Sequence, residues 1–319
     1  MDDPRHARLR RIVSKGFTPR MLGSLEDSVQ NVAAAIVDEI AEKGECDFVT
    51  DVAAALPLKI VCDLMGVPDS AYEMVFANTN IILGIGDPEF APEGVDFVTA
   101  LLNAGADLAQ LMGEVADEKK GGDGRDLTSV LVNAELEDDH LDQADLASFF
   151  VLLVVAGNET TRNAISWGLK YLTDNPDQRA VWAADFEGIA PTAVDEIVRL
   201  ASPVTYMRRT ATEDTVLAGQ EISEGEKVAM FYLAANRDPE VFDDPYRFDV
   251  RRAPNPQYGF GGPGPHFCLG AHLARREITV MFRELFRKLP DIRAIEDPDP
   301  LQSPFIHGVK HMMAEFTPA

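Results

Sequence analysis

One uninterrupted helical segment limits what this chain can fold into more than any other feature of its sequence. It begins near Asp142, a residue type that caps helix N-termini, and continues to Pro176, because a proline ends a helix. Roughly thirty residues at ~1.5 Å each span ~45 Å, the width of a whole domain. The centre of the segment, SFFVLLVVAG, is apolar on every side, so we expect it to run through the core.

The rest of the chain predicts a mainly helical protein with a little sheet. Apolar residues at three- and four-residue spacing predict amphipathic helices at 31–42, 100–118 and 269–289. Alternating apolar residues between turn signals predict short strands at 204–210, 215–217 and 227–233. Six prolines between positions 239 and 265 exclude regular structure there. The expected fold class is mainly α with small β-sheets (α+β), in one domain over 1–319.

Charge and apolar content exclude several classes of partner. The chain has 29 Lys and Arg against 53 Asp and Glu, a net charge of −24, which argues against nucleic acid or anionic membrane as the main partner. The longest apolar run, 147–157, is too short to span a bilayer, so we expect no integral membrane segment. The charged N-terminus shows no signal peptide, and three scattered cysteines fit a reducing compartment, so we expect a cytoplasmic protein.

The strongest chemical signal is the loop GFGGPGPHFCLG at 259–270, directly before the last predicted helix. Glycines let a backbone pass close to a flat or bulky group. A cysteine near a helix N-terminus is stabilised as the thiolate, and such a thiolate suits an axial ligand to haem iron. The alternative is a glycine-rich loop that contains Cys268 by chance, and the loop alone leaves both interpretations open.

A second signal is AGNETT at 156–161, in the middle of the long apolar helix. Buried polar residues in such a place need a reason. Gly157 opens room at the helix face, Thr160 can bond to the carbonyl one turn earlier, and Glu159 offers a proton source. Together they predict a proton-delivery groove, and the alternative is a helix that has emerged into solvent by Asn158.

Two further pairs are weak when taken alone. Glu196 and Arg199 are three residues apart on a predicted helix and can form an ion pair, which on helices is commonly exposed. His6 and Arg10 share a face of a basic N-terminal helix and could both reach an anionic group. Without other information they form only a solvated basic face.

In this order, the four motifs resemble the cytochrome P450 family of haem-thiolate monooxygenases, over the chain from Asp2 to its end. The resemblance implies haem b as cofactor, Cys268 as the axial ligand of its iron, and Glu159 with Thr160 as the proton relay. It implies that a third arginine, Arg247 or Arg252, completes the structural pair of Glu196 and Arg199. The other cofactor-binding residues it implies are His6, Arg10, Gly157, Arg209, Phe260, Gly262, Gly264, His266 and Gly270.

Within the family, the chain is most similar to actinobacterial hydroxylases of methyl-branched lipids and steroid side chains. The segments VVAGNETTRNAISWG, APTAVDEIVRLASPV and FIHGVKH carry this likeness. In the usual phenylalanine position of the cysteine loop stands Gly261, with Phe260 one place earlier, as in this subgroup. The chain begins where the family's third main helix begins. We therefore expect a cytochrome P450 fold that lacks its N-terminal helices and part of its first sheet.

The implied reaction inserts one oxygen atom of O2 into an unactivated C–H bond, by omega-hydroxylation of a methyl-branched lipid or steroid side chain. The expected walls of the substrate pocket are residues 81–85, Val155, Val204, Thr205 and Phe305. The alternatives are a haem-binding protein without turnover and an inactive truncated fragment. A cysteine hydrolase using Cys268 and His266 is disfavoured, because residues two apart in a glycine loop do not easily make a nucleophile–base contact.

Electrons must come from a partner, because the sequence has no flavin or nicotinamide fingerprint. Residues 1–20 hold six Lys and Arg against two Asp, and residues 271–290 hold five against two Glu. In the family both segments lie beside the cysteine, where an acidic ferredoxin, reduced by ferredoxin reductase and NAD(P)H, would dock. The residues expected at this docking face are Arg8, Arg275, Arg276 and Arg283.

Overall fold

The structure is a computed structural model that describes residues 2–14, 17, 23, 26–84, 86–133 and 143–319. Its α-helices are α1 Arg5–Ser14, α3 Glu26–Ile40, α4 Ala55–Met65, α5 Tyr72–Leu83, α6 Phe97–Lys119, α7 Leu127–Val132, α8 Gln143–Asp174, α9 Pro176–Ala184, α10 Phe186–Ala201, α11 Tyr232–Ala235 and α12 Ala271–Lys288. A π-helix, η2 Val49–Ala53, and a 3₁₀-helix, η3 Asp69–Ala71, lie between them. The strands are β1 Glu45–Asp47, β2 Tyr206–Thr210, β3 Thr215–Leu217, β4 Gln220–Ile222, β5 Lys227–Phe231, β6 Arg293–Ala294, β7 Asp299–Pro300, β8 Val309–His311 and β9 Met313–Glu315.

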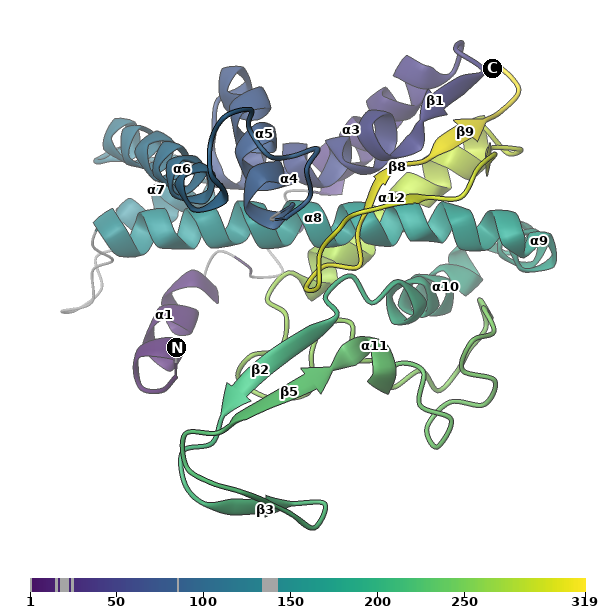
Figure 1. Cartoon of the computed structure of the whole chain (residues 1–319). Helices are drawn as coiled ribbons and strands as arrows, with labels where there is room; N and C mark the ends of the chain where they lie inside the picture. The colour runs from purple at the N-terminus through teal and green to yellow at the C-terminus, as the bar shows by residue number, and fades with distance from the viewer. Residues whose placement is uncertain (1, 15–16, 18–22, 24–25, 85, 134–142) are drawn as a thin grey trace.

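The long helix predicted from the sequence is α8, which crosses the molecule from one side to the other (Figure 1). It ends one residue before Asn175, and Pro176 then occupies the first turn of α9, where a missing backbone N–H costs nothing. The expected cap, Asp142, lies outside the described residues. The other predicted helices are confirmed as α3, α6 and α12, with boundaries shifted by a few residues at their N-terminal ends.

The sheets are small and antiparallel. β2 pairs with β5, from Tyr206 opposite Phe231 to Thr210 opposite Lys227, and the β3–β4 hairpin extends from this ribbon. β9 lies between β1 and β6. The strand expected at 227–233 is shorter than predicted, because α11 begins at Tyr232. The proline-rich stretch carries no helix or strand between Ala235 and Ala271, as expected.

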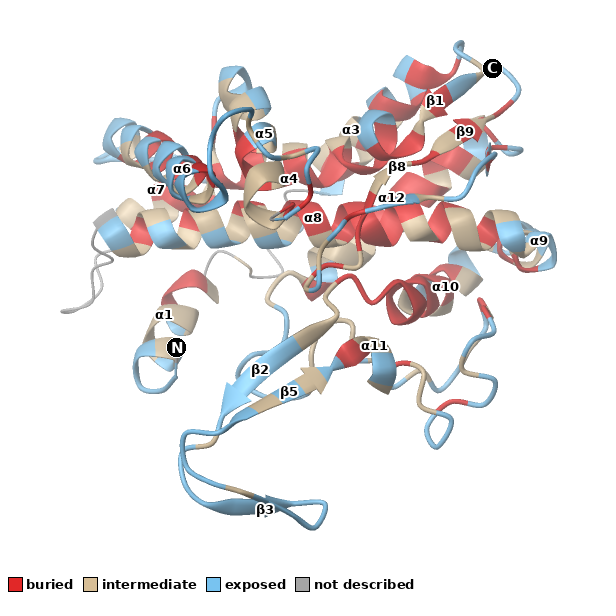
Figure 2. Cartoon of the chain, in the orientation of Figure 1, coloured by how far each residue is buried: buried red, intermediate tan, exposed pale blue. Residues whose placement is uncertain are grey.

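Two hydrophobic clusters share α8. Its first half contributes Leu146, Phe150 and Val154 to a cluster with α4, α6 and α7. Its second half contributes Leu169 and Leu172 to a larger cluster with α3, α10 and α12. The polar AGNETT segment lies between the two, where α4 and α5 also contact the helix. Figure 2 shows this burial around α8, in contrast to the exposed β2–β5 ribbon.

The expectation that the apolar centre of α8 is buried on all sides is wrong for one face. The Leu152 side chain is 60% exposed, and Ala156 one turn later is also exposed. Helices α4, α5 and α6 lie above α8 in Figure 1, while α1 and the β2–β5 ribbon lie below it. Among the described residues only α8 is long and apolar enough to cross a membrane, and here it is the central helix, in contact with α4, α5, α6, α9, α10 and α12.

We expect Gly168→Ala to destabilise the fold by about 1–3 kcal/mol, because overpacking a closed core forces side chains out of place. A Cβ at Gly168 would lie 2.7 Å from Cζ of the buried Phe282 and 3.1 Å from Cδ1 of Ile197, where α8 meets α12 and α10. Gly105→Ala in α6 is the matched control, because its Cβ would meet nothing within 4 Å and helix propensity favours alanine by about 1 kcal/mol. Urea unfolding measures the difference in stability between the two variants. Equal unfolding midpoints would contradict the predicted strain at Gly168.

Candidate functional site

The loop that carries Cys268 is held in shape by its own backbone. The Cys268 N–H donates to the carbonyl of Phe260 at 3.0 Å, which closes the loop on itself. Gly261 and Gly264 have φ of +82° and +139°, a region that side chains rarely adopt. Helix α12 starts at Ala271, three residues after the cysteine, with Gly270 as its N-cap. The loop therefore presents an exposed thiol from a backbone that glycine alone accommodates easily.

The electrostatic surroundings of Cys268 act in opposite directions. The side chain is exposed, yet nearby protein atoms still desolvate it enough to raise the pKa of the thiol. The Gly270 N–H and the positive charges of Arg10 and Arg275 lower that pKa and partly offset the desolvation. A thiolate at Cys268 would thus be stabilised by one backbone N–H and two nearby cations. A positively charged group bound to the sulfur would stabilise it further.

Basic side chains of α1 meet the cysteine loop. Arg10 donates from Nη2 to the carbonyl of Phe267 at 2.6 Å, and the rings of His6 and His266 lie 4.1 Å apart. His6 Nδ1 is buried without a hydrogen-bond partner among the described residues, and Asp3 Oδ1 is 3.7 Å away. Desolvation, followed by the charges of His6 and Arg209, lowers the pKa of His266. The four basic side chains predicted from the sequence therefore interact with one another or with the cysteine loop. They are His6, Arg10, Arg209 and His266.

The positions of Glu159 and Thr160 on α8 differ sharply. Asn158 and Glu159 are fully buried, which excludes the alternative of a helix that has emerged into solvent. Thr160 is only half-buried, and its hydroxyl donates to the Ala156 carbonyl at 2.7 Å, the back-bond expected from the sequence. A Cβ at Gly157 would lie 3.6 Å from Val61, an ordinary contact, so packing does not require glycine there. The acid and the hydroxyl face different surroundings.

The sequence analysis missed the main partner of Glu159. Arg162, one turn along α8, forms a buried ion pair through Nη2 with Glu159 Oε1, and its Nη1 donates to Asn80 Oδ1 of α5 at 2.9 Å. Burial lowers the pKa of Arg162 to about 10, which leaves it charged at neutral pH. The three-residue spacing that identified Glu196 and Arg199 as a pair occurs here too and could have revealed it.

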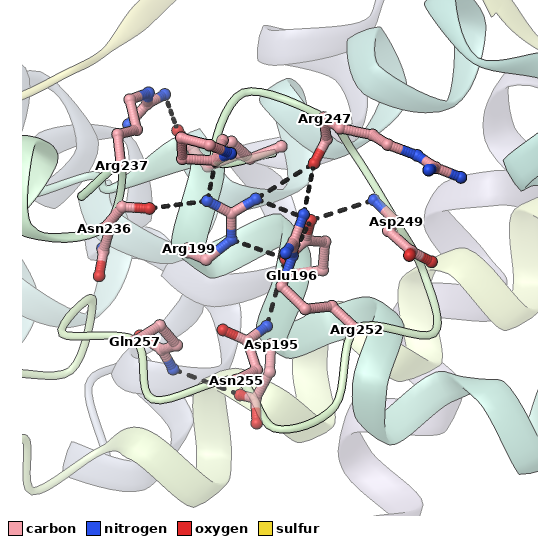
Figure 3. A network of polar contacts seen from close by, with 12 residues as sticks. Asp195, Glu196, Arg199, Asn236, Arg237, Arg247, Asp249, Arg252, Asn255 and Gln257 are labelled. Carbon is pink, nitrogen blue, oxygen red and sulfur yellow. Dashed lines mark hydrogen bonds and ion pairs between the residues drawn. The ribbon is translucent and has the colours of Figure 1, made fainter. Parts of the chain in front are cut away.

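Glu196 and Arg199 form the centre of a buried polar network (Figure 3). Both side chains are inaccessible to solvent, and Arg199 donates to the two Glu196 oxygens at 2.7 and 2.8 Å. Arg252 is the third arginine, with Nε 3.1 Å from both carboxylate oxygens. Arg247 contributes its backbone carbonyl, and Figure 3 shows its guanidinium pointing away from Glu196.

The network extends to the cysteine loop through neighbouring side chains. Gln257 accepts from the Gly259 N–H at 2.6 Å and approaches Asp195, which accepts from Arg275 Nε at 2.8 Å. The Arg275 guanidinium lies 4.3 Å from the centre of the Phe260 ring. A chain of contacts therefore runs from α10 through the irregular segment to the loop and to α12.

The predicted pocket walls are brought together only in part. Val204 forms a backbone bridge with Ile306, and the Thr205 N–H donates to the Phe305 carbonyl at 2.9 Å. Residues 81–83 lie on α5, position 85 lies outside the described residues, and Val155 lies on α8. A small cavity of about 120 Å³ at the loop that follows α5 is lined by Ile81 and Gly84 but by none of the other predicted walls that the structure describes. Its lining also includes Phe90, Val95, Phe97 and Ala100.

Comparison with known proteins decides the family. A family model described as cytochrome P450 matches residues 189–299. The chain is 49% identical to the methyl-branched lipid omega-hydroxylase of Mycobacterium tuberculosis over 97% of its length and 72% of that protein. It is 41% identical to the steroid C26-monooxygenase of the same species, over 99% of its length and 71% of that protein.

The chain belongs to the cytochrome P450 family. A Mycobacterium marinum cytochrome P450 solved in complex with pseudoionone superposes with a TM-score of 0.95 at 46% identity, covering 99% of this chain and 76% of that one. A Bacillus megaterium cytochrome P450 in complex with corticosterone gives a TM-score of 0.90 at 30% identity. The mainly helical P450 fold and the monooxygenase class predicted from the motifs are thereby confirmed.

The family implies a haem-iron cofactor, and the residues of this cytochrome P450 fit one. The donor set near the loop includes one exposed thiol and several basic side chains, among them a buried histidine nitrogen that has no hydrogen-bond partner in the described part of the chain. A thiolate suits the iron, and cationic groups suit the carboxylates of a porphyrin. The exposed apolar face of α8 offers a surface for an apolar ring. The described residues contain no group of three or more His, Cys, Asp or Glu side chains that could hold a bare metal ion.

The network predicts different costs for the two candidate arginines. Arg252→Ala leaves the buried Glu196 with one cation instead of two, and we expect it to lower the free energy of unfolding by about 3 kcal/mol. Arg247→Ala keeps the carbonyl that the network uses and should cost less than about 0.5 kcal/mol. Thermal unfolding of both variants measures the loss of stability. A larger loss in Arg247→Ala than in Arg252→Ala would assign the third position of the network to Arg247.

Proposed function

We propose that this cytochrome P450 hydroxylates a terminal carbon of a methyl-branched lipid or steroid side chain. The relatives that match nearly the whole chain are named for these reactions, one as a methyl-branched lipid omega-hydroxylase and others as steroid C26-monooxygenases. The higher identity to the lipid hydroxylase, 49% against 41%, favours the branched lipid as the substrate class.

The observation that carries the proposal is the exposed Cys268 thiol on its glycine loop with basic side chains of α1 beside it. In the proposal the Cys268 thiolate would ligate the iron of haem b, and His6, Arg10, Arg209 and His266 would hold the two propionates. Phe260, Gly262, Gly264 and Gly270 would shape the loop that holds the cofactor, and Gly157 of α8 would leave room for it. The chemistry that bound haem would supply is the activation of O2 for insertion of one oxygen atom into a C–H bond.

The chain's own residues would handle protons and water. The half-buried Thr160 hydroxyl, which donates to Ala156, still has lone pairs that can accept from water on the open side of α8. Glu159, at the adjacent position, would supply the proton as the acid of the pair. Exposed apolar residues such as Leu152 would exclude bulk water from the site once a lipid covers them.

Electrons would reach this cytoplasmic enzyme from an acidic ferredoxin, itself reduced by ferredoxin reductase and NAD(P)H. The α12 N-terminus beside the cysteine loop carries Arg275 and Arg276. Arg275 pairs with Asp195 at 2.8 Å, and Arg283 pairs with Glu187 at 2.8 Å. The Arg276 side chain is 37% exposed and lies at the longer distance of 4.0 Å from Glu26. Arg276 is therefore the residue of this group with the most freedom to meet a partner carboxylate.

The assignment of Cys268 is tested by Cys268→Ser. The variant should lose the thiolate-type Soret band of the reduced carbon monoxide complex, and with it hydroxylation, because serine does not replace a thiolate ligand. Absorption spectra of the purified protein give the result. A variant that kept the thiolate-type band would contradict the assignment, and wild-type protein that bound haem without turning over a branched lipid or steroid would contradict the proposed reaction.

The docking face is tested by Arg276→Glu, with Arg293→Glu as the matched control. Both replace an exposed arginine near a carboxylate, but Arg293 lies beyond the far end of α12. We expect Arg276→Glu to slow reduction by ferredoxin about tenfold at low salt and much less at high salt, because steering is screened. Stopped-flow reduction measures both. Equal rates for the two variants at low salt would refute docking at this face.

A further inference from the structure

His311, the last residue of β8, lies between two carboxylates from distant parts of the chain. Its Nδ1 bonds to Asp47 of β1, and its Nε2 lies 2.8 Å from Oε1 of Glu89, in the loop that follows α5. These elements all lie above α8 in Figure 1. An ionised carboxylate only accepts hydrogen bonds, so both ring nitrogens must donate. The contacts therefore require the imidazolium, because a neutral ring carries a single N–H.

The two carboxylates differ in how firmly they are held. Asp47 Oδ1 accepts from the N–H groups of Val49 and Met312, at 3.1 and 3.2 Å, which leaves Oδ2 for the histidine. The Glu89 carboxylate has no backbone donor in the part of the chain that the structure describes, and its other contact is Lys310 Nζ at 2.9 Å. Asp47 is thus fixed by its own strand and its neighbour, whereas Glu89 depends on side chains.

A second contact attaches the same loop to the C-terminal strands. The buried Asp87 accepts from the Gln302 N–H at 2.9 Å and lies 3.4 Å from Lys310 Nζ. It also accepts from the Glu89 N–H at 3.0 Å, so the two acids share one arrangement. None of these bonds needs a proton on His311, and this attachment persists when the imidazole is neutral.

The loop forms part of the wall of the cavity of about 120 Å³. Pro88 and Phe90, on either side of Glu89, both line it, and α5 and α6 contribute Ile81 and Ala100 among others. A displacement of Glu89 therefore moves the wall of this cavity.

Charged groups from four segments surround the imidazole and its neighbours. They are Asp47 of β1, Asp87 and Glu89 of the loop, Lys310 of β8 and Asp299 of β7, which pairs with His311 in the sheet. The hydrogen bond to Asp47 raises the pKa of His311, desolvation opposes this, and the bond to Glu89 adds to it. A group whose pKa is raised by folding stabilises the protein fully below its usual pKa, and this contribution is lost as the pH rises through the raised value. The double contact is therefore complete at mildly acidic pH and is lost on the alkaline side.

We propose that the doubly protonated His311 fastens the loop 86–92 to β1 and β8, and that loss of one ring proton at alkaline pH frees Glu89 and loosens the wall of the cavity. The inference does not rest on the proposed function, because it concerns contacts of the protein alone. A neutral ring keeps one N–H and turns a lone pair toward the other carboxylate. Because Asp47 has two backbone donors as well, Glu89 is the acid that is released, while Asp87 keeps the loop attached.

The test is hydrogen exchange of the backbone amides of 86–92, measured by mass spectrometry at about pH 6 and about pH 9, on either side of the histidine range. After correction for the intrinsic rate, exchange in the wild-type protein should be about fivefold faster at the higher pH, the scale of one partly exposed hydrogen bond to a charged group. His311→Gln does not titrate, so its exchange should be as fast at both pH values as that of the wild type at pH 9. Glu89→Gln should stay protected at both, because an amide accepts from the imidazolium and donates to the neutral ring.

His272→Gln is the matched control, because His272 is an exposed histidine of α12 outside this cluster, and it should keep the wild-type pH dependence. Corrected exchange of the α3 amides, 26–40, should not change with pH in any variant, which separates local loosening from a general loss of stability. Exchange in wild-type 86–92 that did not depend on pH would overturn the proposal, and so would a wild-type pH dependence in His311→Gln. If His311→Gln failed to fold, a pH dependence of wild-type size in Glu89→Gln would refute it instead.

Discussion

The buried network around Glu196 is the interaction on which the rest of the site depends. Between Ala235 and Ala271 the chain has neither helix nor strand, so no backbone ladder fixes its path. Arg199 and Arg252 instead bond to the carboxylate and to backbone carbonyls of this segment, including those of Asn236 and Arg247. Ion pairs with these additional hydrogen bonds can be buried, because nearly every donor finds an acceptor. The cysteine loop is positioned by the end of that segment, through Gln257 and Arg275.

Helix α8 organises the remainder by dividing the core. Its two apolar halves enter different hydrophobic clusters, and the polar stretch from Asn158 to Asn163 lies where the clusters separate. There the helix can bury polar groups because α5 and β8 supply partners, as Asn80 and Val309 do. The opposite face, with Leu152 and Ala156, stays exposed. Helix α8 is therefore a core element on one side and leaves apolar residues exposed on the other.

Sequence reasoning was reliable where a local pattern decides the outcome. The helices, the end of α8 at Pro176 and the lack of regular structure around the six prolines follow from periodicity and from backbone restrictions. It was less reliable where distant segments meet. Nothing in the spacing distinguished Arg247 from Arg252, since both precede the loop by a similar distance. The pocket walls named from resemblance come from α5, α8 and the segments around Val204 and Phe305, where Thr205 bonds to Phe305 and Val204 bridges to Ile306.

By itself the sequence identified the candidate residues for the chemistry: a cysteine in a glycine loop, an acid beside a hydroxyl in an apolar helix, and two basic segments in an acidic chain. These are local properties, because residue type and short spacing set conformation, charge and reactivity. Only the tertiary structure decided which way each group faces. It turned Glu159 toward Arg162 and Asn80, exposed one side of α8, and chose Arg252 over Arg247. Burial and pairing depend on what other elements bring to the same place, and a sequence read along one dimension does not contain that information.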